Sequence, residues 1–345
     1  MADAAESRFT YDALAEKVQQ PGWLFTLAAG LSFCVVLLIF VGALVTSNDA
    51  GLSVPDWPTT YGRNMFLYPV SEWRGKILYE HGHRLLASGI GVITLLLAVG
   101  IFLREKRRWM KILAAIAVLA VILQGVLGGL TVLYRLPTPI SVAHGMLAQT
   151  FMLLVIAIAY FLSNEYRLRS AGQVDNSAIL FSPACITTAL LYLQLLLGAI
   201  TRHSGSGLAV PDFPKMGGMW VPDFSIRMLT SINNVRHSYG LGPVTLEQVG
   251  YHLMHRAGAV IVTVAILWLA FNYYNKIESS SLKKHLALLI CLIIVQFVLG
   301  VATVLSVRDP VITSLHVATG AALLGLSFLL SLRSIPVNLY DIKNS

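Results

Sequence analysis

The stretch Glu80-His81-Gly82-His83-Arg84 lies where a long polar segment enters an apolar one. A close copy, His252-Leu253-Met254-His255-Arg256, stands at the corresponding point of a later apolar segment. Glu80 and His83 are three residues apart, so on a helix they share a face. Ionisable side chains at the end of a membrane helix are costly to keep there. Both stretches are therefore predicted to be functional.

The composition is that of an integral membrane protein. Of the 345 residues, 56% are hydrophobic and only 12% charged, and the mean hydropathy is +0.71. Soluble domains carry about a quarter charged residues. The net charge of +8 is then expected in cytoplasmic loops and predicts no nucleic-acid partner. Cys34, Cys185 and Cys291 all fall in apolar runs, which predicts neither a loop disulfide nor a cysteine metal cluster.

Eight apolar segments are each close to the roughly 20 residues that a helical span needs. Helices are expected because a span in lipid must satisfy its own backbone hydrogen bonds. The predicted spans are 23–45, 83–102, 110–133, 140–162, 179–200, 251–273, 286–305 and 311–332.

Basic residues in the short connections predict the orientation. Ten lie in the connections after the second, fourth and sixth spans, whereas the connections after the third and seventh hold only Arg135 and Arg308. Basic residues favour the cytoplasmic side, so both termini are predicted there. The two long loops, 46–79 and 201–250, then face the outside. The ten residues are Arg104, Lys106, Arg107, Arg108, Lys111, Arg167, Arg169, Lys276, Lys283 and Lys284.

The chain contains an internal repeat. Residues 42–46 and 51–58 recur at 198–202 and 207–214, an offset of 156, and Gln124 recurs as Gln296, an offset of 172. The second long loop must therefore hold sixteen additional residues. Each half has an even number of spans, so the halves share one orientation. We predict an all-α membrane protein built as two tandem four-helix bundles related by a pseudo-twofold axis along the membrane normal.

This repeat defines the predicted domains. The N-terminal bundle is 23–163 and the C-terminal bundle is 179–333. A cytoplasmic linker, 164–178, joins them, and cytoplasmic tails cover 1–22 and 334–345.

Four of the nine histidines are repeated, namely His83, His144, His255 and His316. Each half thus offers two imidazoles at one membrane depth on two helices. This suits a porphyrin whose iron is ligated from both faces. Arg84 and Arg256 follow the first histidine of each pair and are predicted to meet the propionates.

Two other interpretations of these histidines stay open. Buried histidines can simply hydrogen-bond between helices. A zinc or copper site is also conceivable, but only two histidines converge in each half, and neither a cysteine nor a second carboxylate joins them.

The halves differ where Glu80 corresponds to His252. A carboxyl in an apolar site has a tunable pKa suited to acid–base chemistry, so Glu80 is the predicted catalytic residue. The alternative is a plain ion pair with Arg84. The difference suggests that one site reacts while the other carries electrons.

These residues resemble the haem A synthase family, membrane enzymes that convert haem O to haem A for terminal oxidases. The resemblance covers the eight spans and rests on Glu80-x-x-His83-Arg84, His144, His255-Arg256 and His316, with the loop 51–58 similar to the family's first outer loop. Many members carry a cysteine pair in that loop, and this chain does not.

The resemblance implies a division of roles. His83 and His144 would bind the substrate haem O, and Glu80 would assist oxidation of a peripheral methyl to a formyl group. His255 and His316 would be axial ligands of a permanent haem b that passes electrons, with His252 as a further candidate contact. It also implies a bacterial cytoplasmic membrane, haem sites near the outer face, an electron donor, and a haem O-producing farnesyltransferase as possible partner.

Two other functions compete. A di-haem cytochrome b that only carries electrons shares the four histidines but gives no reason for Glu80. A transporter would explain the repeat, yet transporter sites usually lie at the midplane and not near the outer edge.

Overall fold

Eight long helices dominate the computed structural model, which describes residues 22–170, 176–220 and 222–336. Within these ranges, eight helices are long and apolar enough to cross a membrane, and no strand is present. The predicted all-α membrane protein with eight spans is confirmed. The spans are α2 (Trp23–Ser47), α3 (Lys76–Arg104), α4 (Arg108–Leu133), α5 (Thr138–Leu162), α7 (Phe181–His203), α9 (Leu246–Tyr273), α10 (Ser280–Leu305) and α11 (Pro310–Arg333).

Three spans begin at least five residues earlier than predicted. α3, α9 and α10 were expected to begin at residues 83, 251 and 286, but they begin at Lys76, Leu246 and Ser280, where charged or polar residues interrupt the apolar stretch. Side-chain caps stabilise the first turns of α9 and α10. Thr245 and Gln248 form a capping box at the start of α9, and the side chain of Ser279 accepts a hydrogen bond at the start of α10. Glu80 and His252 consequently lie inside helices.

Two short helices were not predicted. α6 (Asn164–Ser170) lies in the linker, and α8 (Ile226–Ser238) lies in the second outer loop. α8 begins at Ser225, whose hydroxyl accepts from the backbone N–H of Met228, and it buries Met228 and Ile232. It occupies the loop in which the repeat predicted sixteen additional residues.

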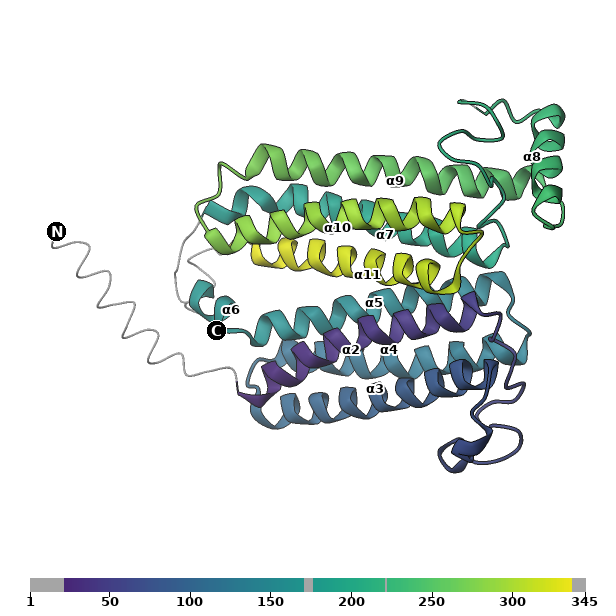
Figure 1. Ribbon diagram of the computed structural model, residues 1–345. Helices are drawn as coiled ribbons and strands as arrows, with labels where there is room; N and C mark the ends of the chain where they lie inside the picture. Colours follow the sequence, from purple (N-terminus) through teal and green to yellow (C-terminus); the bar gives the residue numbers. More distant parts are fainter. Residues whose placement is uncertain (1–21, 171–175, 221, 337–345) are drawn as a thin grey trace.

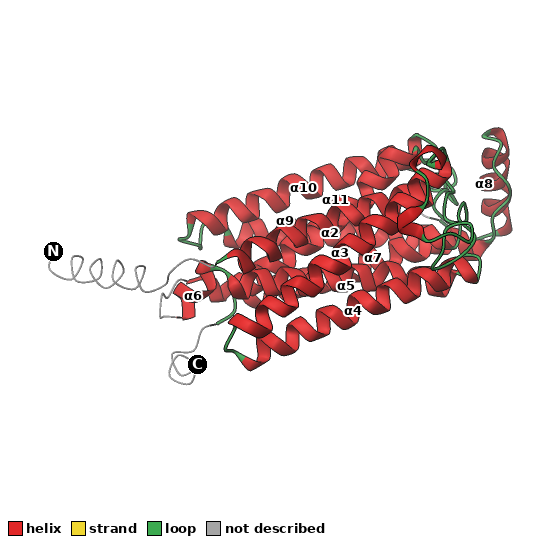
Figure 2. Ribbon diagram, turned by 90° about the horizontal axis from the view of Figure 1, so that it is seen from below, coloured by secondary structure: helices red, strands yellow, loops and turns green. Residues whose placement is uncertain are grey.

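The helices form two groups that are visible in Figure 1, and Figure 2 shows the long helices running in roughly the same direction. In the first group α2 contacts α3 and α5, and α4 contacts the same two helices. In the second group α7 contacts α9 and α11, and α10 contacts the same two. This pairing is what tandem four-helix bundles require. The twofold axis and the domain boundaries stay predictions, and the tails 1–21 and 337–345 lie outside the described residues.

The two groups meet along a seam formed by α2, α5, α7 and α11. Small residues allow close approach there. A methyl group at Gly325 of α11 would lie 2.9 Å from Ile156 of α5, and one at Gly320 would lie 3.0 Å from Leu195 of α7. The seam is therefore closely packed toward the middle of the helices.

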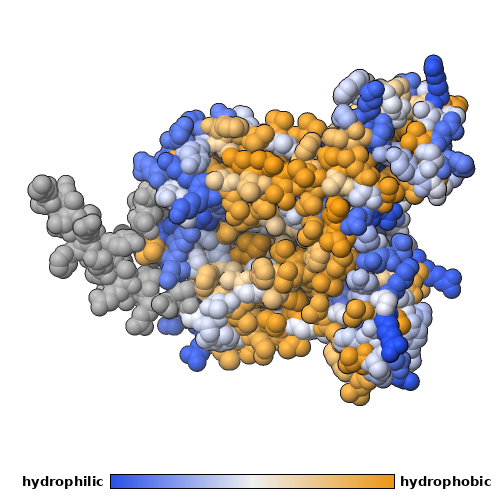
Figure 3. Space-filling view, viewed as in Figure 1, coloured by the Kyte–Doolittle hydropathy of each residue, from blue (hydrophilic) through white to orange (hydrophobic). Residues whose placement is uncertain are grey.

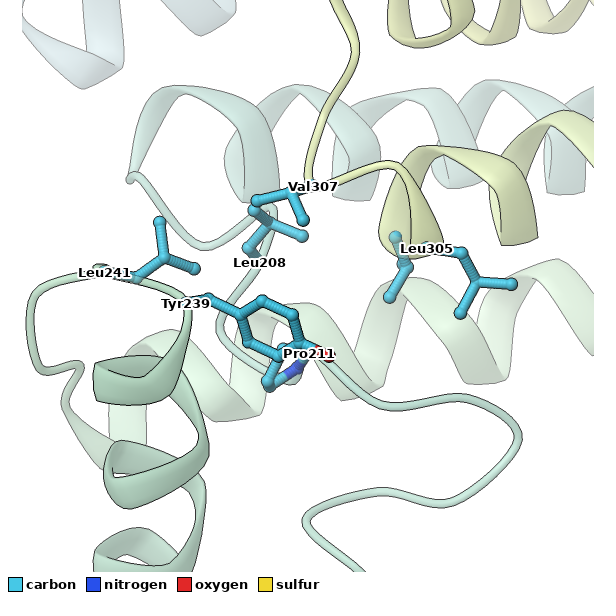
Figure 4. A pocket seen from close by; sticks show the side chains of 7 residues that line it. Leu208, Pro211, Tyr239, Leu241, Leu305 and Val307 are labelled. Carbon is cyan, nitrogen blue, oxygen red and sulfur yellow. The ribbon is translucent and has the colours of Figure 1, made fainter.

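The surface follows the expected pattern of a membrane protein. Figure 3 shows an apolar band over the helices with hydrophilic residues at both ends. At the outer end, the second loop rests on the end of α10, where Leu208, Tyr239 and Val307 border a recess of about 40 Å³ (Figure 4). Ligand sites usually enclose about 300–1,000 Å³, so this recess is a packing feature.

Candidate functional site

One large cavity is lined by residues from all eight spans and from both outer loops, with a volume of about 1470 Å³. Its lining is mainly apolar. The volume exceeds the roughly 300–1,000 Å³ of an ordinary ligand site. The cavity therefore has room for more than one large ligand.

The four repeated histidines all line this cavity. His83 comes from α3, His144 from α5, His255 from α9 and His316 from α11. The ring centroids of His255 and His316 are 6.4 Å apart, with the ring planes at 87°. His83 and His144 are close enough to interact electrostatically. Each half thus brings together the two imidazoles that the repeat predicted.

Each of the four rings rests on a glycine of a neighbouring helix. A methyl group added at Gly42, Gly128, Gly198 or Gly300 would lie between 2.9 and 3.1 Å from the Cε1 atom of the facing histidine. The pairs are Gly42 with His83, Gly128 with His144, Gly198 with His255, and Gly300 with His316. Each imidazole thus occupies the space that a side chain at the facing glycine would fill.

Two glutamines, each one turn before a supporting glycine on the neighbouring helix, donate hydrogen bonds to the backbone of the histidine helices. The Gln124 side chain donates to the carbonyl of His144 (3.1 Å), and the Gln194 side chain donates to the carbonyl of His255 (2.9 Å). These bonds join neighbouring helices at the depth of the ligands. They leave the backbone that carries each imidazole little freedom to shift.

The ring nitrogens of the four histidines form few hydrogen bonds with the described residues. The buried Nδ1 atoms of His83, His144 and His316 have no hydrogen-bond partner, and only Nδ1 of His255 approaches a side chain, that of Gln194, at 3.0 Å. Among the described residues, Nε2 of none of the four forms a hydrogen bond. Histidines that merely join helices would have partners, so this interpretation is disfavoured.

The donor set fits a haem. Two imidazoles that bind one metal from opposite sides, with bonds of about 2.0 Å, bring their ring centroids to roughly 6 Å. The 6.4 Å between His255 and His316 agrees with this spacing. A bare zinc or copper site is not supported, because no group of three His, Cys, Asp or Glu side chains suited to a metal occurs in the described part of the chain.

Glu80 is buried, with 4% of its surface exposed, and it lines the cavity. Its carboxylate pairs with Arg84 (2.7 Å) and accepts from the Ser53 hydroxyl (2.9 Å) and the Val54 backbone N–H (2.8 Å). The ion pair with Arg84, which was the alternative to catalysis, is thus present. Both carboxylate oxygens are held by these contacts, and the residue still lines the cavity.

His252, the counterpart of Glu80, has equivalent contacts. Its Nδ1 atom lies 2.9 Å from the carbonyl of Ser206, and its Nε2 atom accepts from Nε of Arg256 (2.8 Å). Both side chains therefore attach the preceding long loop to its helix. Only Glu80 adds a negative charge.

Arg84 and Arg256 each make a similar set of loop contacts. Arg84 donates to the carbonyls of Val54, Asp56 and Thr59 as well as to Glu80. Arg256 donates to the carbonyls of Val210, Asp212 and Lys215 as well as to His252. A guanidinium has five donors, so one remains on each. The observed role is to hold the loop, and the propionate role stays a prediction.

The two loops close in matching turns above the cavity. The Asp56 carboxylate accepts from the backbone N–H groups of Tyr61 and Gly62, and Asp212 accepts from those of Gly217 and Gly218. Burial alone would raise the pKa of Asp56, but its hydrogen bonds outweigh this and lower the pKa below its usual 3.8.

Two kinds of functional position were missed in the sequence. The four glycine supports were one, although Gly42 and Gly198 belong to the repeated motif. The other was Arg202, which lies at the end of α7 and lines the cavity. A charged residue directly after an apolar run is a signal that would have identified it.

The fold and the site define an integral membrane protein whose eight spans enclose a cavity with two histidine pairs. Residues 25–328 match the family model described as cytochrome oxidase assembly protein, COX15-CtaA. The match covers most of the chain, and the chain belongs to this family, which is the haem A synthase family that the sequence resembled.

Individual relatives agree with this assignment. The chain is 29% identical over 305 residues to the heme A synthase of Shewanella oneidensis, covering 84% of this chain and 89% of the relative. It is 27% identical over 358 residues to the heme A synthase of Rickettsia bellii, covering 94% and 98%. The similarity therefore extends over nearly the full length of both proteins.

Proposed function

We propose that this chain is a haem A synthase, an enzyme that oxidises a peripheral methyl of haem O to a formyl group for use in terminal oxidases. The observation that carries the proposal is the presence of two histidine pairs around one cavity in a chain of this family. The cavity volume of about 1470 Å³ supports two porphyrin-sized ligands.

The two halves have different roles in this proposal. His83 and His144 hold the substrate haem O in the N-terminal half. His255 and His316 hold a haem b in the C-terminal half, which supplies one-electron transfer when bound. The 6.4 Å between the latter two rings supports this arrangement.

Glu80 is the residue proposed to act in the reaction. Two successive two-electron oxidations, each of which would need an oxygen source and an electron acceptor from outside the chain, would hydroxylate the methyl twice, and loss of water from the geminal diol would give the aldehyde. Glu80 lines the cavity, and Arg84, Ser53 and Val54 hold its carboxylate in one position. A carboxylate fixed in this way can accept and return a proton at the reacting carbon substituent.

The location follows from the charge pattern. Both termini are proposed to lie in the cytoplasm of a bacterium, with the histidine pairs near the outer face of the inner membrane. A farnesyltransferase that makes haem O and an electron donor are the proposed partners.

The test replaces Glu80 and identifies the pigments. Glu80→Gln and the control Glu247→Gln, an exposed position at the start of α9, are purified, and their pigments are extracted and identified by mass. Glu80→Gln is expected to contain haem O and haem B with haem A reduced at least about a hundredfold, because general acid–base groups contribute roughly 10²–10⁴-fold. Normal haem A from Glu80→Gln would remove Glu80 from the mechanism.

A di-haem electron carrier is the second candidate. The ion pair between Glu80 and Arg84 favours it, because a carboxylate that only anchors a loop needs no catalytic role. The pigments of the unaltered protein distinguish the two. Haem B with haem O or haem A supports the synthase, haem B alone supports the carrier, and a protein without porphyrin contradicts both.

A further inference from the structure

Two arginines outside the repeated motifs line the cavity where the two groups of helices meet. Arg202 ends α7, and Arg308 lies just before α11. Arg202 crosses the seam and donates from Nη2 to the carbonyl of Ala43 (2.7 Å) and to the Ser47 hydroxyl (2.8 Å) of α2. Its other guanidinium nitrogens form no hydrogen bond with the described residues and are available to a ligand.

Neither arginine has an acidic partner at contact distance. No salt bridge joins Arg202 or Arg308 to any residue that the structure describes. The charged groups that act on Arg202 are Arg308, a like charge, and Asp49, an exposed residue. Arg308 is exposed and Arg202 is half-buried beside the apolar cavity, and an anionic ligand there would stabilise both guanidinium groups.

The N-terminal half has no arginine at the equivalent positions. At the offset of 156 Arg202 corresponds to Thr46, and at the offset of 172 Arg308 corresponds to Leu136. The structure supports the second match, because Leu136 and Arg308 have positive φ angles of 60° and 65° and face Gly51 and Gly207 respectively. The same backbone site thus presents a leucine in one half and a guanidinium in the other.

Arg202 acts on the C-terminal histidine pair, and Arg308 acts on Arg202. Arg202 acts electrostatically on His316, whereas the groups that act on His83 and His144 do not include it. On the other side of the seam the neighbour of His144 is His203, an imidazole and not a guanidinium fork. The ligands of the two histidine pairs would therefore have different charged groups beside them.

We propose that Arg202 and Arg308 form a carboxylate-binding subsite that retains the porphyrin of the C-terminal half by its propionates. Thr46 and Leu136 leave the N-terminal half without this subsite, so its porphyrin exchanges more readily. This inference rests on the proposed function, in which one haem is permanent and the other is a substrate that must enter and leave. Guanidinium groups suit the role because they bind carboxylates bidentately.

The experiment measures how fast each half loses its porphyrin. The double variant His83→Ala/His144→Ala confines binding to the C-terminal half. The purified protein is loaded with haem B, mixed with excess apomyoglobin, and the transfer is followed by absorbance. Adding Arg308→Leu is expected to speed the loss of haem at least about tenfold, since hydrogen bonds to charged groups are strong. Arg135→Leu, an exposed arginine outside the cavity lining, is the control and should leave the rate unchanged.

Two further measurements separate carboxylate binding from packing. The dimethyl ester of haem B lacks free carboxylates, so Arg308→Leu should not change its rate of loss. The reverse substitution, Leu136→Arg, in a His255→Ala/His316→Ala background should slow the loss of haem B from the N-terminal half. Arg202→Thr is a second variant, but Arg308→Leu suffices if the loss of the bonds to α2 prevents folding.

The outcomes distinguish this inference from the proposed function. Equal rates for haem B with and without Arg308→Leu would overturn the subsite while leaving the two haem sites intact. An equal acceleration for the dimethyl ester would also overturn it. Absence of any haem spectrum in the His83→Ala/His144→Ala background would overturn the haem b assignment and the subsite together.

Discussion

At the scale of single residues, glycine and histidine act as a pair. Each imidazole of the site lies on a helix surface from which a side chain is missing, and each buried Nδ1 of His83, His144 and His316 is left without a partner. Ring position is thus set by shape and not by hydrogen bonds. A ligand that is coordinated by an imidazole on each side would find ring nitrogens that are not already hydrogen-bonded.

The glycine supports can be tested by adding one methyl group. Gly198→Ala places a Cβ 3.0 Å from Cε1 of His255, so the ring must move by a few tenths of an ångström. We expect about tenfold weaker haem retention in the C-terminal half, comparable to the loss of other groups that orient metal ligands. Titration of the purified protein with haem B, followed by absorbance, measures the effect. Gly89→Ala in α3, with open space around it and outside the cavity lining, is the control; equal weakening in both would contradict the ring-support role.

Substitutions in the two histidine pairs are expected to remove different pigments. His255→Ala should remove the b-type absorbance, whereas His83→Ala should chiefly reduce bound haem O, because the two pairs are proposed to bind different porphyrins. Reduced-minus-oxidised spectra and pigment analysis measure the two effects. His237→Ala in α8, outside the cavity lining, should change neither. Loss of the same pigment from both variants would contradict the division between halves.

At the scale of elements, each outer loop is attached to the helix that carries the first histidine of its half. Arg84 holds the first loop by three carbonyls, and Arg256 holds the second in the same way. Both arginines directly follow a histidine of the site. Loop closure and ligand position are therefore linked through one turn of α3 and one turn of α9.

The first loop has an expected dependence on pH. Hydrogen bonds lower the pKa of Asp56 in the folded protein, so this carboxylate stabilises the loop above its unfolded pKa of about 4. That stability is lost as the pH falls through the lower folded value. Trp57 fluorescence should be constant from about pH 8 to 5 and change below about pH 4.

Two variants check this pH dependence. Asp56→Asn keeps the size of the side chain but removes the titration, so its fluorescence should not change in the same range. Trp57→Phe identifies the signal among the six tryptophans of the chain. An unchanged acid transition in Asp56→Asn would show that another group controls the loop.

At the scale of the whole molecule, the two groups of helices share one cavity. α5 and α11 contact each other at the seam, and each also contacts a helix pair of its own group. The histidines of both halves line the same space, with Arg202 bridging α7 and α2 beside them. This arrangement places both histidine pairs in one apolar enclosure, which would allow the proposed electron transfer between two bound porphyrins.

The predicted orientation can be tested with single cysteines. Lys106→Cys lies in the exposed connection between α3 and α4, and Ser71→Cys lies in the first outer loop. In intact cells a membrane-impermeant maleimide should label Ser71→Cys, while Lys106→Cys should react only after the membrane is opened. A background with the three native cysteines replaced by alanine is the control. The reverse labelling would invert the topology.

The sequence alone determined the eight spans, the repeat and the four histidines. Hydropathy is a property of contiguous residues, and a repeat relates equivalent positions without any knowledge of packing. The first turns of α3, α9 and α10 were missed because charged or polar residues there lower the hydropathy, and side-chain caps stabilise only those of α9 and α10. α8 was missed because a short amphipathic helix gives a weak signal within a polar loop.

Only the tertiary structure decided which groups face the ligands. The supports Gly42 and Gly198, the loop contacts of Arg84, and the approach of Arg202 to Ala43 join residues that are between 25 and 159 positions apart. Spacing along one helix cannot specify such contacts, because they depend on how neighbouring helices rotate and pack. The internal repeat therefore predicted that the histidines lie at one membrane depth, and helix packing orients them toward a common cavity.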